Sequence, residues 1–88
     1  MKGSVVAKIS SSEAIRLMTK VRETAGTLSP TDIEVVEENL EIIGSEAKND
    51  TPKKNIVKLA LRGLQAIKGT AEFSAAVTTL VQFFQGIL

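Results

Sequence analysis

The chain has 88 residues, of which 43% are hydrophobic and 24% charged, and its formal net charge is +1. This composition excludes a mostly disordered chain, which would need low hydrophobicity together with high net charge. Cysteine and histidine are absent, which excludes disulfides, thiolate metal sites and catalysis by a thiol or an imidazole. No segment reaches the about 18 consecutive apolar residues of a transmembrane helix, and the N-terminal stretch lacks the apolar core of a signal peptide. We therefore expect a cytoplasmic protein.

The first helix signal begins at a cluster of serines. Ser10 and Glu13 have the spacing of a capping box, in which each side chain accepts a hydrogen bond from the backbone N–H of the other residue. The following apolar residues recur every three or four positions: Ala14, Leu17, Met18, Val21 and Ala25. This period predicts a helix over residues 11–25 that ends at Gly26.

A second helix is predicted over residues 30–46. Ser29 is expected to cap it, and Pro30 occupies the first helical position, where its missing N–H costs nothing. The apolar stripe of this helix consists of Ile33, Val36, Leu40 and Ile43. Gly44, or Asn49 after a frayed turn, is expected to end the helix.

A third helix is predicted over residues 52–67, because Thr51 and Pro52 repeat the same arrangement of a capping residue before proline. Its apolar arc consists of Ile56, Val57, Ala60, Leu64 and Ile67, widened by Leu59 and Leu61. Gly69 is expected to end it. Gly63 lies inside the helix and costs about 1 kcal/mol relative to alanine, so we expect another helix to cross it closely.

A fourth helix is predicted over residues 71–86, with Thr70 as its N-cap and Glu72 in its first turn. Its broad apolar face consists of Phe73, Ala76, Val77, Leu80, Val81, Phe84 and Leu88. Phe83 and Ile87 lie outside this stripe. Because the helix is apolar over most of its circumference, we expect it to be covered on more than one side.

These elements predict an all-α fold, a small bundle of four short helices. Residues 1–9 are expected to form a short N-terminal tail or arm, and residues 10–88 a single helical domain. The connections are short, which favours antiparallel neighbours. An angled hairpin of the last two helices is the alternative.

The charged residues are segregated along the chain. Residues 29–50 carry seven acidic residues and one lysine, whereas residues 51–68 carry five basic residues and no acid. The helical period places two sets on continuous helix faces: Glu34, Glu37, Glu38 and Glu41 on the second helix, and Lys54, Lys58 and Arg62 on the third. Two interpretations follow: solvated faces that partly pair with each other, or surfaces that orient a partner.

The sequence does not predict an enzyme. A serine nucleophile has no histidine to activate it, and the six glycines do not form a phosphate-binding loop. Every acidic residue falls on a polar face or in a cap, and carboxylate metal sites in bundles normally add histidine. We therefore expect no metal, no cofactor and no small-molecule substrate.

The remaining prediction is a non-catalytic protein–protein interaction or oligomerisation module, whose partner is a second copy, as in a homodimer, or another chain. The apolar contacts are predicted at Leu80, Phe83, Phe84 and Ile87. The charged contacts are predicted at Glu34, Glu37, Glu38, Glu41, Lys54, Lys58 and Arg62. Apolar contacts would supply affinity, and charged contacts orientation.

Two alternatives remain. The uncharged segment 73–88, which follows the basic helix, has the pattern of an interfacial membrane anchor, although tryptophan and tyrosine are absent. The basic helix would suit weak nucleic-acid binding through phosphate contacts, but the strongly acidic helix before it disfavours this partner.

Overall fold

The computed structural model describes residues 12–47, 49 and 51–86 of the chain. The described part contains four α-helices, one short 3₁₀ turn and no strand, which confirms the all-α prediction. The elements are α2 (Ser12–Thr24), η1 (Ala25–Thr27), α3 (Pro30–Ala47), α4 (Lys54–Gln65) and α5 (Ala71–Gln85). The predicted tail over residues 1–9 and the predicted cap at Ser10 lie outside the described residues.

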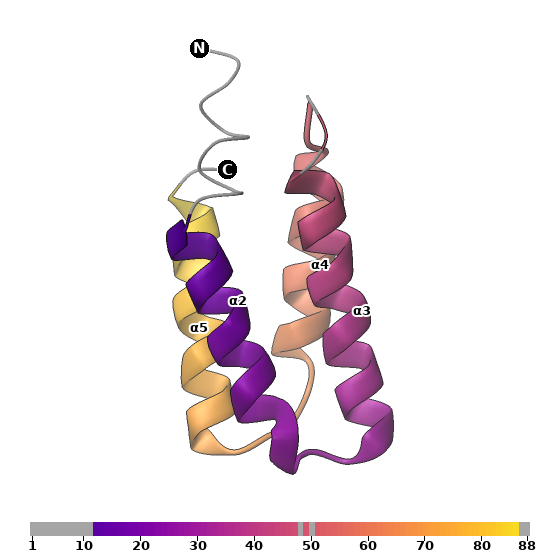
Figure 1. Ribbon diagram of the computed structural model, residues 1–88, viewed down its shortest axis with the longest axis vertical. Coiled ribbons are helices and arrows are strands. Elements are labelled where there is room, and N and C mark those ends of the chain that lie inside the picture. The colour runs from indigo at the N-terminus through magenta and orange to yellow at the C-terminus, as the bar shows by residue number, and fades with distance from the viewer. Residues whose placement is uncertain (1–11, 48, 50, 87–88) are drawn as a thin grey trace.

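The four helices form an up-and-down bundle, in which each helix runs antiparallel to the next one along the chain (Figure 1). Two pairs make the most extensive contacts: α3 packs on α4, and α2 packs on α5. The contact between α4 and α5 is smaller, and that between α2 and α3 is smaller still. The bundle is therefore two tight helix pairs laid side by side.

Two predicted caps are confirmed. The Ser29 Oγ accepts a hydrogen bond from the backbone N–H of Asp32 at 3.2 Å, at the start of α3. The Thr70 Oγ1 accepts one from the backbone N–H of Phe73 at 3.1 Å, at the start of α5. Each bond satisfies one of the backbone donors that the first helical turn leaves free.

The predicted cap at Thr51 is wrong. The helix α4 begins at Lys54, two residues later than expected, and the side chain of its N-cap residue Lys53 makes no capping bond. The carboxylate of Glu46, near the end of α3, instead accepts a hydrogen bond from the backbone N–H of Lys53 at 2.9 Å. The same oxygen accepts from the Asn49 side chain at 3.2 Å, so the preceding helix organises this turn.

The predicted glycine stops are also wrong. The helix α2 passes into the 3₁₀ turn η1 without a left-handed residue at Gly26, and no described glycine has a positive φ. Gly44 lies inside α3, which continues to Ala47 and so ends close to Asn49, the alternative stop. The helix α4 ends at Gln65, four residues before Gly69. None of these helices therefore ends at a glycine in the left-handed conformation.

Two glycines permit close packing. A Cβ at Gly63 would lie 2.8 Å from the side-chain oxygen of Asn39 on α3, which confirms the predicted close crossing of α4 by another helix. A Cβ at Gly69 would lie 2.7 Å from the ring of Phe73 and 3.0 Å from Leu28. A side chain larger than hydrogen would displace a neighbour at both positions.

The core lies between the two helix pairs and is apolar throughout. Its largest fully buried side chains are Phe73, Phe84, Ile43, Leu64, Leu80, Val21, Val36 and Val57. No polar or charged side chain of the described residues is buried. The charged residues of the described ranges therefore all lie on or near the surface of the bundle.

Candidate interaction surface

The structure corrects the predicted apolar contact surface on the last helix. Leu80 and Phe84 are fully buried in the core, so the folded chain does not offer them to a partner. Phe83 is partly buried, packs against the core and makes an edge-to-face contact with Phe84, with ring centroids 5.4 Å apart. Ile87 lies outside the described residues. The reason is that the neighbouring helices cover the broad apolar face of α5.

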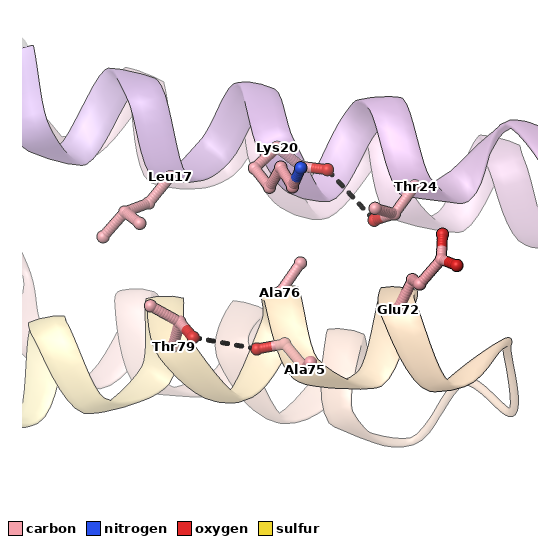
Figure 2. Close-up of a pocket in the computed structure, with 7 residues that line it drawn as sticks. All are labelled: Leu17, Lys20, Thr24, Glu72, Ala75, Ala76 and Thr79. Carbon is pink, nitrogen blue, oxygen red and sulfur yellow. Dashed lines mark hydrogen bonds between the residues drawn. The ribbon is translucent and has the colours of Figure 1, made fainter.

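The outer face of α5 carries small or uncharged side chains: Ser74, Ala75, Thr78, Thr79, Gln82 and Gln85. Between α2 and α5 lies an open groove whose lining includes Leu17 and Ala76, with the Glu72 carboxylate projecting from α5 toward α2 (Figure 2). None of the large apolar side chains in the described part of α5 is exposed.

The large exposed apolar side chains lie on other helices. They are Ile15 on α2 at 55% exposure, Ile42 on α3 at 40% and Leu59 on α4 at 63%. The prediction that Leu59 widens the apolar arc of its helix is wrong, because its side chain is mostly exposed. The helical pattern gave no role to Ile15 and Ile42. Leu59 follows Val57 by two residues and so lies about 200° around the helix from it, which places it opposite the buried face.

Ile42 and Leu59 lie on the same side of the molecule. Ile42 lines a shallow groove between α3 and α4 together with Ile56, and Leu59 is one turn along α4 from Ile56. We call these three residues, Ile42, Ile56 and Leu59, the apolar strip. The strip follows the seam between α3 and α4.

The predicted acidic residues flank this strip on α3. Glu34, Glu37, Glu38 and Glu41, here called the acidic stripe, are all exposed. Glu38 and Glu41 line the same groove as Ile42. Glu37 points toward α2 and pairs with Arg22, with 3.5 Å between Nε and Oε1. The acidic stripe therefore covers the outer surface of α3, from the apolar strip toward α2.

The predicted basic residues flank the strip on the other side. Lys54, Lys58 and Arg62, here called the basic stripe, are all exposed. Lys58 and Arg62 line the groove between α4 and α5, together with Leu61, Val81 and Gln85. The basic stripe thus lies on the α5 side of α4, away from α3.

The two stripes do not pair with each other within the chain. In the described ranges the ion pairs are Arg16 with Glu13 and Arg22 with Glu37, so none joins α3 to α4. The expected partial pairing between these helices is therefore not made in this part of the chain. Across the outer face of the α3–α4 pair the order is acidic stripe, apolar strip, basic stripe.

The described residues contain no group of three or more acidic side chains placed to hold a metal ion. None of the helices in these ranges combines the length and apolar character needed to cross a membrane. The grooves described above are open to solvent and lie between neighbouring helices. The outer face of the α3–α4 pair is consequently the most distinctive surface of the described chain.

No protein-family model matches the chain, and comparisons with curated proteins and with solved structures find no significant match.

Proposed function

We propose that the chain is a non-catalytic protein-interaction module that binds its partner through the outer face of α3 and α4. One observation carries the proposal: exposed apolar side chains lie between an acidic and a basic stripe that do not pair with each other within the described chain. The apolar side chains of such a face can be buried against a partner, and its charges can orient that partner.

The apolar strip would supply most of the affinity. Burying a leucine or isoleucine side chain from full exposure contributes about 1.5–3 kcal/mol, and Leu59 is 63% exposed. Exposed ion pairs contribute only about 0–1 kcal/mol each. The stripes would therefore act mainly on orientation and on the rate of association, which electrostatic attraction increases.

The non-catalytic part of the proposal is supported by the composition, because the chain contains no histidine or cysteine to act as a general base or a nucleophile. No polar or charged side chain of the described residues is buried. Enzyme sites usually hold such groups in a concave pocket that is shielded from water, and the grooves here are open and lined by ordinary surface residues.

Site-specific photo-cross-linking in the cell tests the proposal. A benzophenone amino acid in place of Leu59 should form protein adducts, and the same group in place of exposed Gln82 on α5 should form few. Reversing the basic stripe with Lys58→Glu and Arg62→Glu should reduce the adducts at position 59. Equal adduct yields at positions 59 and 82 would contradict the proposal. An adduct yield at position 59 that the charge reversal does not change would also contradict it.

A second candidate function, weak nucleic-acid binding, is favoured by the position of the basic stripe on the side of α4 away from the acidic stripe. Three phosphate contacts would give a slope of about −2.7 in log K against log salt concentration. A gel-shift assay at about 50 mM salt tests it, because charge-driven binding is strongest at low salt. The absence of retardation there would eliminate this function.

The membrane alternative loses its main support. It required the apolar side chains of the last helix to be available to a lipid surface, whereas Phe73, Leu80 and Phe84 are fully buried. Co-sedimentation with anionic vesicles would test what remains of this idea, and we expect the chain to stay in the supernatant.

A further inference from the structure

We infer that the partner is a second copy of this chain, and that two copies pack the outer faces of their α3–α4 pairs together around a two-fold axis parallel to the helices. The inference rests on the proposed interaction function and names its partner. The observation behind it is the order of acidic stripe, apolar strip and basic stripe across one face.

This order makes the face complementary to itself. A two-fold dimer uses the same patch on both copies, so every feature of the patch must find its complement within that patch. The apolar strip lies centrally and would meet the apolar strip of the other copy. The two stripes have opposite charge and lie on opposite sides of the strip, so each can meet the other stripe of the second copy.

The charges also select the direction of the two-fold axis. An axis across the helices would place α3 on α3 of the second copy, with acidic stripe against acidic stripe. An axis along the helices places α3 on α4 of the second copy, so that opposite charges meet in both halves of the interface. Like charges in contact oppose association, so the axis along the helices is favoured.

The heights of the charged residues fit this arrangement. Gly63 on α4 lies opposite Asn39 on α3 in the antiparallel pair. Arg62 is therefore level, along the helix axes, with Glu38 and Glu41. Lys58 lies within one helical turn of the level of Glu41. A rotation about an axis parallel to the helices leaves these heights unchanged. Arg62 and Lys58 of each copy therefore come within reach of the acidic stripe of the other.

The size of the face predicts a weak, reversible dimer. The 18 residues of α3 make a helix about 27 Å long, and two helices side by side are about 20 Å wide. A contact of this size buries about 500 Å² on each copy, or about 1,000 Å² in total, near the lower limit for a specific interface. We expect the dimer to dissociate at micromolar concentrations.

A charge-swap experiment tests the inference. One variant carries Glu38→Lys and Glu41→Lys, and the other carries Lys58→Glu and Arg62→Glu. Each variant alone brings like charges together and should be a monomer, whereas an equimolar mixture should dimerise at least as well as the original chain. Mass is measured by size-exclusion chromatography with light scattering and refractive-index detection, because the chain has no tryptophan or tyrosine to absorb at 280 nm.

A control variant distinguishes the effect of where the charges lie from the effect of the net charge. Glu23→Lys with Glu72→Lys changes the net charge as much as the first variant does, but both residues are exposed on α2 and α5. This control should dimerise like the original chain. Circular dichroism at 222 nm verifies that every variant keeps its helices.

Each outcome has a definite meaning. A monomeric original chain at all concentrations would overturn the inference, and so would a dimer that neither reversal affects. Failure of the proposed function would look different, because cross-linking at position 59 would then form no protein adducts at all. Adducts with a mass other than twice the 9.4 kDa of the chain would keep the interaction function and reject self-association.

Discussion

The α2–α5 pair and the α3–α4 pair are built from helices of similar length but use their apolar residues differently. The helix α5 buries Phe73, Leu80 and Phe84 completely, and its outer face is uncharged and nearly free of large apolar side chains. The α2–α5 pair leaves Ile15 on α2 exposed, whereas the α3–α4 pair leaves Ile42 and Leu59 exposed between two charged stripes.

A helix with a high apolar content is therefore not necessarily the helix that exposes apolar side chains to a partner. The last helix has the higher apolar content, and its large apolar side chains are used in the core. The helix α4 is strongly amphipathic, and Leu59 on its polar side is the most exposed large apolar residue described. A single exposed leucine is ordinary on a protein surface. Leu59 supports the proposed surface because it lies one turn from Ile56, which lines the same groove as Ile42.

The largest expected effect comes from making the same substitution in each pair. Leu80→Ala removes a fully buried side chain from α5 and should lower the free energy of unfolding by about 2–5 kcal/mol. Leu59→Ala on α4 should change it by less than about 0.5 kcal/mol. Urea unfolding followed by circular dichroism, at a protein concentration low enough to avoid association, measures both. Equal losses would show that Leu59 also belongs to the core.

The two glycines inside helices offer a sharper comparison. Gly63→Ala would gain about 1 kcal/mol in helix propensity, but its Cβ would clash with Asn39, whose amide donates to the Val35 carbonyl. Overpacking costs about 1–3 kcal/mol, so we expect Gly63→Ala to lower the free energy of unfolding by about 1 kcal/mol. A Cβ at Gly44 would have no neighbouring atom within 4 Å. Gly44→Ala should therefore raise the free energy of unfolding by up to about 1 kcal/mol.

An Asn39→Ala background isolates the clash. There Gly63→Ala should stabilise the chain, which reverses the sign of its effect, and thermal unfolding at fixed pH would detect the reversal. If Gly63→Ala destabilised both backgrounds equally, the close approach of α4 to Asn39 would not be the reason for the glycine.

The turn within the α3–α4 pair and the turn from α4 to α5 differ in how the following helix is capped. Thr70→Ala removes the cap of α5 and should cost about 1 kcal/mol, while Thr70→Ser should cost much less. Thr51→Ala should change the free energy of unfolding by less than about 0.5 kcal/mol, because Glu46 organises that turn. Denaturant midpoints of the three variants would test this order, and a larger loss at Thr51 would reverse it.

The smallest effect concerns the contact between the pairs. Arg22 and Glu37 join α2 to α3 through an exposed ion pair, so a double-mutant cycle with alanine should give a coupling below about 1 kcal/mol. The coupling should decrease further in 1 M salt, where screening is nearly complete. A coupling that persisted at high salt would indicate packing between the two side chains.

Much of the fold could be predicted because it depends on local chemistry. The serine before Pro30 and Thr70 before Ala71 act on backbone groups within three residues, so both caps could be identified in the sequence. The cap of α4 could not, because the carboxylate that organises it belongs to the preceding helix. The predicted glycine stops at Gly26, Gly44 and Gly69 assumed a left-handed glycine, and no described glycine adopts that conformation.

The candidate site could be predicted only in part. The positions of the acidic and basic stripes followed from the helical period, because charged side chains on a polar helix face remain exposed. Leu80 and Phe84 were assigned to a partner because a sequence does not show which sides of an apolar helix its neighbours cover. Ile42 was missed, and Leu59 was wrongly placed in the apolar arc of α4, although its position about 200° around the helix from Val57 puts it outside the buried face.

Spacing within one helix or turn was enough to predict the four helices of the described residues, two of their caps and the segregation of charge. The tertiary structure alone decided which apolar side chains remain exposed and where the two stripes lie relative to each other. That choice depends on how neighbouring helices rotate about their axes to bury the most apolar surface, and it involves residues far apart in the chain. It placed an apolar strip between two stripes of opposite charge.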